Sequence, residues 1–363
     1  MTTRNQPLRA AVLGATGTVG QRFVTLLAEH PWFELTALAA SERSAGKLYR
    51  DAVTWIQTRP IDDAVAAMPV RTIDELADHA KLPGGDLDIV FSALDASVAR
   101  DVEPRFARRY LVVTNASAHR MDADVPLIVP EVNPDHLSLL SPPEGGRALP
   151  AGIVANPNCS TIGLVLALKP LADAFGFERI SVVTLQAVSG AGLPGISSYQ
   201  ILDNVIPWIS SEEEKLEIET GKILGRAAGG TIEPAEVAVS AQCNRVPVVD
   251  GHTLCISVDL KGEPAMEDVR EAWRTFRAEP QERGLPSAPA QPTVYLGDDE
   301  PPQARVHRDL GRGMTTSIGR LRECPILGYR FVALSHNTLR GAAGGALLAA
   351  ELAVARCGRR ATG

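Results

Sequence analysis

A glycine-rich loop between a strand and a helix, close to the start of the chain, constrains the fold more than any other feature of the sequence. The apolar run 8–13 leads into Gly14, Gly17 and Gly20, and residues 21–27 follow with helical spacing. Glycines at this spacing permit a tight turn, let the backbone approach a pyrophosphate and let the helix pack on the sheet. The pattern predicts an α/β fold whose first loop binds a dinucleotide. The cofactor-binding residues predicted in this loop are Gly14, Thr16, Gly17, Thr18, Val19 and Gly20.

The end of the second predicted strand, 33–40, bears on which dinucleotide is bound. An NAD enzyme carries an acidic residue at about this distance from the glycine loop, where it hydrogen-bonds the ribose hydroxyls. Here the chain has Ser41, Arg43 and Ser44, and two hydroxyls with a guanidinium suit a 2′-phosphate. We therefore predict NADP as the cofactor. Glu42 leaves NAD open, because its carboxylate could hold a ribose diol.

Two further buried strands are predicted at 87–91 and 111–114. In a doubly wound sheet the loops at the carboxyl ends of the central strands line the ligand site. The residues predicted beside the cofactor are Ser92, Ala93 and Leu94. Beyond the second of these strands, Arg120 is a candidate anion clamp, because a guanidinium can hold two oxygens of a phosphate or carboxylate. A solvated surface arginine would give the same pattern.

A polar turn at mid-chain, 155–161, runs into an apolar segment and contains Cys159. Pro157 ends the preceding strand and Ser160 or Thr161 opens a helix, so the thiol is expected in the first helical turn. The N–H groups and partial positive charge of a helix start lower the pKa of a thiol and can receive a carbonyl oxygen as the thiolate attacks. The local pattern leaves open a second interpretation, a small buried cysteine without chemistry.

Length and composition limit the class of protein. A chain of 363 residues with 45% hydrophobic and 22% charged residues predicts a globular α/β protein of two domains. Its net charge of −7 argues against a nucleic-acid or anionic membrane surface, and no uncharged run reaches the roughly 18 residues of a transmembrane helix. The five cysteines are widely spaced and lack a zinc-site pattern. We therefore expect no metal, a cytoplasmic location, and small molecules or further subunits as partners.

The second half of the chain is expected to form a mixture of strands, helices and polar loops. The elements predicted there are strands at 180–188 and 254–260, a glycine-rich loop at 189–195 and an amphipathic helix at 211–224. Proline and charge in 279–302 predict a long loop. Residues 337–355 begin with small side chains and predict a helix that returns to the first domain.

Five motifs, taken together, resemble those of aspartate-β-semialdehyde dehydrogenases. They are GATGTVG at 14–20, ANPNCST at 155–161, LQAVSGAG at 185–192, RVPVVDGH at 245–252 and NTLRGAAGG at 337–345. Their order and spacing resemble this family over essentially the whole chain, above all its archaeal and fungal branch. The resemblance implies an N-terminal Rossmann-like domain of residues 1–158 and 337–363, which binds NADP. Residues 159–336 would form an α+β catalytic and dimerisation domain, and the chain a homodimer or homotetramer.

The resemblance also implies a role for each matched residue. Cys159 matches the nucleophile, His252 the general acid/base and Gln186 the residue that orients the intermediate. The residues matched to substrate are Arg245 for the α-carboxylate, Glu212 for the amine, and Arg120, Lys215 and Asn115 for the phosphate. Glu213 and Glu214 compete with Glu212 for its role. The residues matched to the nicotinamide side are Ser189, Gly190, Gly192 and Asn337.

The implied reaction is the NADPH-dependent reductive dephosphorylation of L-β-aspartyl phosphate to L-aspartate 4-semialdehyde, a step toward lysine, threonine, methionine and isoleucine. The Cys159 thiolate would form a thioester, phosphate would leave, and NADPH would supply hydride. His252, with a reference pKa near 6.5, would move protons in both directions at neutral pH.

Three alternatives use part of the same pattern. A reductase of a coenzyme A thioester such as malonyl-CoA would need the thiolate and NADPH, but not the arginine and lysine of a phosphate site. N-acetyl-glutamyl-phosphate reductase shares the chemistry, but the motifs around Cys159 and His252 fit it less well. An NADP-binding redox sensor, in which Cys159 is oxidised, would have no use for Gln186, Arg245 and His252 in matching positions.

Overall fold

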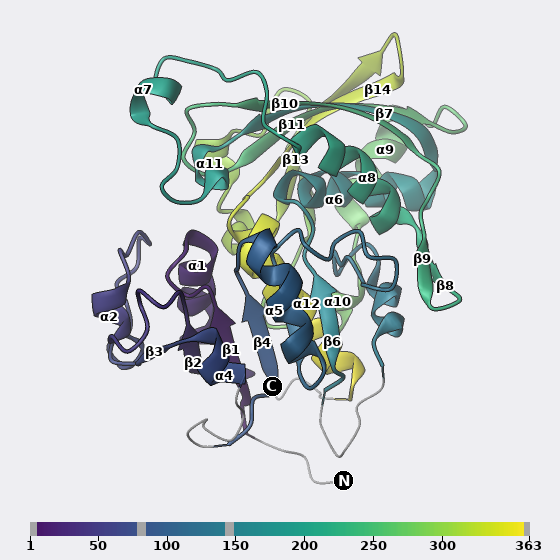
Figure 1. Cartoon of the computed structure of the whole chain (residues 1–363). Coiled ribbons are helices and arrows are strands. Elements are labelled where there is room, and N and C mark those ends of the chain that lie inside the picture. Colours follow the sequence, from purple (N-terminus) through teal and green to yellow (C-terminus); the bar gives the residue numbers. More distant parts are fainter. Residues whose placement is uncertain (1–5, 78–84, 142–148, 359–363) are drawn as a thin grey trace.

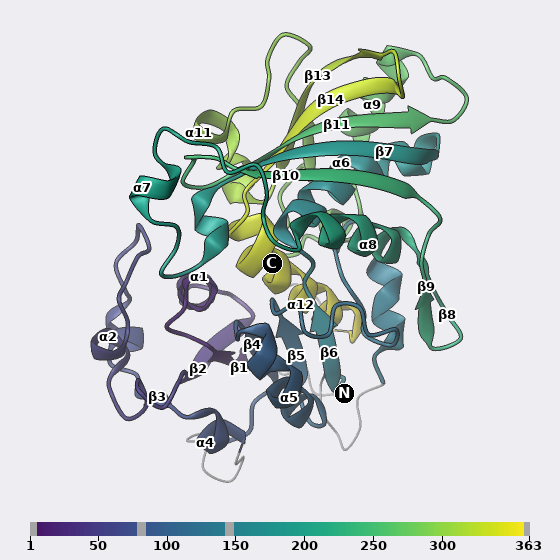
Figure 2. The same ribbon diagram turned by 45° about the horizontal axis from the view of Figure 1, so that its top comes forward.

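The structure, a computed structural model, describes residues 6–77, 85–141 and 149–358. Two parts lie one above the other in Figure 1, each built on its own sheet. The lower part contains the N-terminal strands, and the upper part contains the strands of the second half of the chain. Figure 2 looks onto the upper sheet more directly.

The lower sheet is parallel, with the strand order β3-β2-β1-β4-β5-β6. Its central strands are apolar and fully buried, as expected when helices cover both faces of a parallel sheet. The order reverses at β1, so a ligand crevice is expected at the carboxyl ends of β1 and β4. The strands are β1 (Leu8–Leu13), β2 (Phe33–Ala39), β3 (Val70–Arg71), β4 (Ile89–Ser92), β5 (Leu111–Thr114) and β6 (Gly152–Ala155).

The glycine loop brings the first helix, α1 (Thr18–Leu27), close to the sheet. A Cβ at Gly20 would lie 2.1 Å from the Gly14 carbonyl oxygen, and a Cβ at Gly14 would lie 2.5 Å from that of Ala93. Gly14 also has φ +74°, which favours glycine. The loop can therefore take this shape only with glycine at both positions.

The C-terminal helix, α12 (Gly344–Arg356), packs into the core of the lower part, as predicted (Figure 1). Its alanines and leucines share one apolar cluster with β1 and α1. Arg340, just before it, is fully buried in an ion pair with Glu131. The C-terminal helix thus completes the core of the part that the N-terminal strands form.

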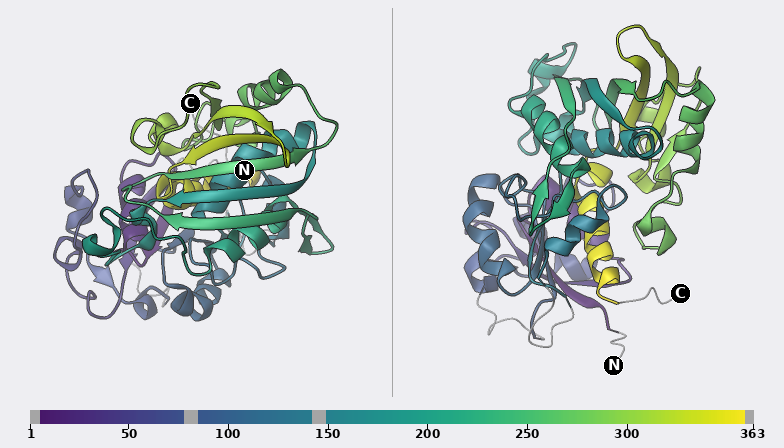
Figure 3. Two further views of the ribbon diagram at one scale, coloured as in Figure 1. Left: turned by 90° about the horizontal axis from the view of Figure 1, so that it is seen from above. Right: turned by 90° about the vertical axis from the view of Figure 1, so that its right-hand side faces the viewer.

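The upper sheet is mixed, with the order β10-β7-β11-β14-β13-β12. Along β11, Leu254, Ile256 and Val258 are buried beneath helices α6 and α9, whereas Cys255 on the opposite face is exposed. Seen from above, the described helices leave that opposite face open (Figure 3). The elements are α6 (Cys159–Ala174), β7 (Phe177–Gln186), α8 (Glu212–Leu224), β10 (Ala238–Arg245), β11 (His252–Leu260), α9 (Met266–Thr275), β12 (Thr293–Tyr295), β13 (Thr316–Cys324) and β14 (Gly328–Ser335).

The prediction of one long loop over 279–302 is wrong. This segment holds a short helix, α10 (Glu279–Glu282), and strand β12, which pairs with β13. Pro280 lies in the first turn of α10, where proline is favourable. Tyr295 of β12 stacks on Trp273, with 5.5 Å between the ring centroids. Long-range packing therefore stabilises a strand that the proline-rich local sequence does not predict.

The remaining elements lie within the two parts and in the loops that join their strands. They are α2 (Tyr49–Ala52), α3 (Asp63–Ala66), α4 (Ile73–Ala77), α5 (Ala96–Ala107), η2 (Pro134–Leu139), η3 (Val188–Ala191), α7 (Ser198–Ile201), β8 (Arg226–Ala228), β9 (Thr231–Glu233), α11 (Ala304–His307), η4 (Leu310–Gly313) and the π-helical turn η5 (Leu339–Ala343). Within the described residues, no helix is long and apolar enough to cross a membrane. That part of the chain also contains no group of three or more His, Cys, Asp or Glu side chains able to hold a metal.

Candidate active site

Cys159 is the first residue of α6, in the first helical turn as predicted. The residue that caps this helix is Asn158, whose Oδ1 accepts the backbone N–H groups of Ser160 (2.9 Å) and Thr161 (3.2 Å). The prediction that Ser160 or Thr161 opens the helix is wrong, because Asn158 is the cap and both residues already lie within the first turn. The Asn158 cap also occupies N–H groups that were expected to receive a carbonyl oxygen.

The C-terminal segment holds the other side of Cys159. A Cβ at Gly341 in η5 would lie 2.7 Å from the Cys159 Cβ and 3.1 Å from its Cα. A glycine is therefore required where the two chain segments touch. Cys159, the predicted nucleophile, thus lies at the contact between the start of α6 and the C-terminal segment.

A cavity of about 320 Å³ opens beside Cys159 and is lined from both parts of the molecule. The predicted residues that line it are Thr18, Val19, Leu94, Asn115, Arg120, Cys159, Gln186, Ser189, Gly190, Gly192, Glu212, Lys215, Arg245 and Asn337. The fold thus brings together most of the residues that were proposed from widely separated motifs.

Other predicted cofactor residues lie outside this cavity. Ser92 is the last residue of β4, which lies between β1 and β5 in the sheet, so it is fully buried. It therefore does not line the cavity. Ser41 and Arg43 are exposed on the turn after β2. Since Leu13 pairs with Ala39, that turn leaves the sheet at the same edge as the glycine loop. The remaining residues of this group are Gly14, Thr16, Gly17 and Gly20 in the loop itself, Ala93 against Gly14, and Ser44 on the turn.

His252, at the start of β11, directs one ring nitrogen at the thiol. Its Nε2 lies 3.2 Å from Cys159 Sγ, although the two residues are 93 positions apart. Its Nδ1 accepts the backbone N–H of Ala187 at 3.0 Å. A backbone amide can only donate, so Nδ1 carries no hydrogen and the neutral ring holds its hydrogen on Nε2, facing the sulfur.

Burial keeps both members of this pair uncharged. Burial, followed by the negative charge of Glu212, raises the pKa of Cys159 to about 12, against the opposing charges of Arg120 and Arg245. Burial, followed by the charge of Arg245, lowers the pKa of His252 to about 3. The expectations of a lowered thiol pKa and of a histidine titrating near 6.5 are therefore wrong. A low dielectric penalises the ionised form of either group more than the helix start favours the thiolate.

Glu212 is the centre of a hydrogen-bond cluster on the cavity wall. Its carboxylate accepts from Asn158 Nδ2 (2.8 and 3.0 Å), Gln186 Nε2 (3.3 Å) and Lys215 Nζ (2.9 Å). Burial acts to raise the pKa of Glu212, but the charge and hydrogen bond of Lys215 and the two amides outweigh it and lower that pKa. Glu212 is thus an anion that already has partners.

The neighbouring glutamates face elsewhere. Glu213 accepts the backbone N–H of Cys243 at 3.0 Å, and Glu214 is exposed to solvent. Helical geometry turns successive side chains by about 100°, so only one of three adjacent residues can face the cavity. The structure selects Glu212 as the residue that lines it.

Arg120 and Asn115 line the cavity from the loop after β5. Arg120 donates from Nη1 to Glu219 Oε1 (3.0 Å) and from Nη2 to the Asn115 carbonyl (2.9 Å). The Asn115 side chain accepts from Asn156 Nδ2 at 2.9 Å. Asn158 and Glu219 were not predicted as site residues. Asn158 lay within the quoted motif, and Glu219 follows Glu212 by two helical turns, a spacing that puts both on one face.

The residues matched to the nicotinamide side lie beside Arg245, which was matched to the substrate α-carboxylate. Arg245 donates from Nη1 to the Ala187 carbonyl at 2.8 Å, and a Cβ at Gly190 would lie 2.9 Å from that same nitrogen. Asn337 accepts the N–H of Gly251 and donates to Ser189 Oγ, both at 2.8 Å. The C-terminal segment therefore ties the glycine-rich loop to the start of β11.

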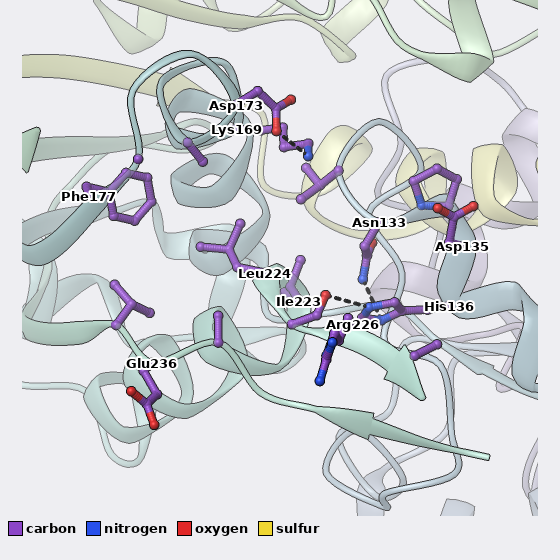
Figure 4. A pocket seen from close by; sticks show the side chains of 18 of the residues that line it. Asn133, Asp135, His136, Lys169, Asp173, Phe177, Ile223, Leu224, Arg226 and Glu236 are labelled. Carbon is purple, nitrogen blue, oxygen red and sulfur yellow. Dashed lines mark hydrogen bonds and ion pairs between the residues drawn. The ribbon is translucent and has the colours of Figure 1, made fainter. Parts of the chain in front are cut away.

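A second cavity, of about 550 Å³, lies between η2, α6 and the β8 segment (Figure 4). Its polar groups largely satisfy one another: Asn133 donates to His136 Nδ1 at 3.0 Å, and Lys169 pairs with Asp173 at 2.7 Å. His136 Nε2 donates to the Gly225 carbonyl at 3.1 Å. None of the predicted site residues lines this cavity.

Two family models match this chain, one for each part of the fold. A model for the NAD binding domain of semialdehyde dehydrogenases matches residues 9–140, and one for their dimerisation domain matches residues 168–340. The aspartate-semialdehyde dehydrogenase of Methanothermobacter thermautotrophicus is 50% identical over 95% of this chain and 98% of its own length. The chain belongs to the aspartate-semialdehyde dehydrogenase family. The aspartate-semialdehyde dehydrogenase of the fungus Candida albicans is 47% identical over 96% of this chain and 98% of its own length.

Solved structures of the family agree. The Candida albicans enzyme, crystallised with NADP, superposes with a TM-score of 0.87 at 45% identity, covering 96% of this chain and 98% of that one. Aspartate semialdehyde dehydrogenase II of Vibrio cholerae, in complex with ASA, has a TM-score of 0.72 at 28% identity, with the same coverage. The resemblance inferred from the five motifs and the predicted fold class are confirmed.

Proposed function

We propose that this chain reduces L-β-aspartyl phosphate to L-aspartate 4-semialdehyde with NADPH, through a thioester on Cys159. One observation carries the proposal. The Cys159 thiol and the His252 imidazole are 3.2 Å apart beside a cavity lined by the cations of Arg120, Lys215 and Arg245. An acyl phosphate offers a leaving group and anionic oxygens that suit such a site.

The glycine loop is suited to the cofactor. A Cβ at Gly14 or Gly20 would fill the space against neighbouring carbonyls, and α1 starts without a side-chain cap. Its first N–H groups are therefore available to a pyrophosphate. We propose that Ser41, Arg43 and Ser44 hold the 2′-phosphate of NADP. When bound, NADPH supplies the hydride that reduces the thioester.

Acylation begins at the Cys159 sulfur. The thiolate bonds to the acyl carbon, the carbon–oxygen bond to phosphate breaks, and the thioester remains on the enzyme. After reduction, the tetrahedral oxyanion collapses, expels the thiolate and leaves the aldehyde. Because the helix N–H groups of Ser160 and Thr161 are bonded to Asn158, we assign stabilisation of this oxyanion to the Nε2–H of His252.

His252 acts first as a hydrogen-bond donor. Its Nε2–H points at Sγ, so in this tautomer it stabilises a thiolate whose proton has passed to solvent. To accept the thiol proton at Nε2, the ring must first carry its hydrogen on Nδ1, and this breaks the bond from the Ala187 N–H. General acid/base work by His252 therefore requires a rearrangement of that contact.

The charged groups of the substrate replace an ion pair that the side chains of the site form with each other. We propose that the α-carboxylate binds Arg245 and the substrate ammonium binds Glu212, replacing Lys215 there. Lys215 is then free to hold the phosphate together with Arg120. Asn115 orients Arg120 through its carbonyl oxygen, and Gln186 orients the intermediate from the Glu212 side. One substrate molecule thus supplies charges of both signs that suit the cluster.

Domain roles follow from the same proposal. Residues 1–158 and 337–363 would bind NADP, and residues 159–336 would catalyse and dimerise. The match of 168–340 to a dimerisation domain and the open sheet face support a homodimer or homotetramer. The free cysteines suit a reducing, cytoplasmic setting.

The test is phosphate-dependent reduction of NADP by aspartate semialdehyde, followed at the nicotinamide absorbance. Malonyl-CoA with NADPH is run beside it, with Cys159→Ala as the blank. Turnover that requires both semialdehyde and phosphate is expected. Oxidation of NADPH by the coenzyme A thioester alone would overturn the substrate while leaving the thiol chemistry, and NADP binding without any turnover would favour the redox sensor.

A further inference from the structure

Glu219 of α8 joins two parts of the site without lining the cavity. Only 2% of its surface is exposed, and its two oxygens have different partners. Oε1 accepts from Arg120 Nη1 at 3.0 Å, and Oε2 accepts the backbone N–H of Asn158 at 2.6 Å. One buried carboxylate therefore connects the loop after β5 with the start of the helix that carries Cys159.

We infer that Glu219 is a positioning residue, which fixes the guanidinium of Arg120 relative to the thiol of Cys159. The inference rests on the proposed phosphate-binding role of Arg120. Arg120 lines the cavity, and its charge is among those that act on the Cys159 thiol. A phosphate on the acyl group attacked by that thiol must lie within reach of both residues.

The backbone of Arg120 is held by the same helix. Lys222, one turn after Glu219, donates from Nζ to the carbonyl oxygens of Arg120 and Asp122, each at 2.7 Å. Glu212, Lys215, Glu219 and Lys222 follow one another at intervals of three or four residues, so they share one face of α8. This face holds Arg120 at both its guanidinium and its main chain.

The arrangement leaves part of the guanidinium free for a ligand. Nη1 is bonded to Glu219 and Nη2 to the Asn115 carbonyl, whereas the buried Nε has no hydrogen-bond partner among the described residues. That Nε is closed off from the cavity, but Nη1 and Nη2 each carry a second N–H beyond these two bonds. Phosphate oxygens would accept from those N–H groups, and Glu219 would keep the guanidinium in the orientation that presents them.

Both the charge and the length of glutamate are needed for this task. Two N–H donors converge on the residue, and a carboxylate offers an acceptor to each, whereas an amide would turn its NH₂ toward one of them. Aspartate keeps the charge but is one methylene shorter, so it cannot reach both donors from the same backbone position. The two replacements therefore separate position from charge.

The experiment compares Glu219→Gln and Glu219→Asp with the wild type in the phosphate-dependent direction. Glu217→Gln is the matched control, since Glu217 on the same helix accepts the backbone N–H of Ala241 at 3.2 Å but lies at the surface. For both Glu219 variants we expect the KM for phosphate to rise roughly tenfold or more, because small misplacements of a binding group are costly. The KM for NADP should change by less than about twofold in every variant, since the glycine loop is untouched.

Binding is measured separately from turnover. Inorganic phosphate should protect Cys159 from alkylation by iodoacetamide, read on the Cys159 peptide by mass spectrometry, and the Glu219 variants should need correspondingly more phosphate. A wild type with neither turnover nor protection would overturn the proposed function itself. Wild-type protection that both variants retain would overturn the role of Glu219, and so would a lowered unfolding temperature with an unchanged KM for phosphate. A Glu219→Asp variant equal to wild type would show that charge alone matters, against positioning.

Discussion

Replacing Glu212 with glutamine is expected to lower the pKa of the Cys159 thiol and to speed its alkylation. Burial is the first cause of the raised pKa, and the charge of Glu212 is the second. Glutamine is nearly the same size and keeps one oxygen for the amides of Asn158 and Gln186. The change therefore removes the charge with little change in packing.

The size of the effect follows from the pKa. With a pKa of about 12, only about one Cys159 thiol in ten thousand is ionised at pH 8. Removing a nearby like charge lowers a pKa by about one unit or more, which multiplies the thiolate fraction by about ten. Because the pKa is raised, the wild-type alkylation rate should climb about tenfold per pH unit and reach no plateau below pH 10.

The assay is alkylation by iodoacetamide between pH 7 and pH 10, followed on the Cys159 peptide by mass spectrometry. The exposed Cys357 serves as an internal reference for reagent concentration. Glu214→Gln is the matched control, because Glu214 sits on the same helical turn but faces solvent. A wild-type rate that levels off with a midpoint below about pH 9 would refute the reasoning from burial. A Glu212→Gln protein that reacts no faster than wild type would refute the contribution of the charge.

Three further changes test the site. Cys159→Ala should abolish turnover yet leave NADPH binding nearly intact in a fluorescence titration, and substantial residual activity would contradict the covalent mechanism. Arg245→Leu should raise the KM for the semialdehyde by about tenfold or more, since a charged hydrogen bond contributes about 1.5–3 kcal/mol, and an unchanged KM would remove its carboxylate role. Gly341→Ala should lower both kcat and the unfolding temperature, because the new Cβ would lie 2.7 Å from that of Cys159; a variant with normal kcat would show that this contact relaxes freely.

Local patterns in the sequence were sufficient to predict the strands, loops and helices that contain the motifs. The glycine spacing at 14–20 predicted strand, loop and helix, and the turn at 155–161 predicted a helix that begins near Cys159. These features depend on contacts among residues a few positions apart, which the sequence records directly. The five motifs also sufficed to indicate the family, which the comparisons confirm.

Local patterns were insufficient to predict an element that residues far away in the sequence stabilise. Strand β12 lies in a stretch rich in proline and charge, and pairing with β13 and stacking on Trp273 stabilise it. This strand therefore depends on geometry that no short window contains. The cap of α6 is a different case: Asn158 lies only two residues before Ser160 and asparagine is a preferred capping residue, so the correct cap was present in the local sequence.

Only the tertiary structure decided the pairing and charge of the site. By sequence alone Glu212, Glu213 and Glu214 were candidates, with Glu212 preferred, and the rotation of α8 turned only the first into the cavity. The contact between Cys159 and His252 joins residues 93 positions apart, and their burial reverses the expected direction of the thiol pKa. Ionisation depends on the dielectric and charges around a group in space, and those are set by the whole fold rather than by neighbours in the chain.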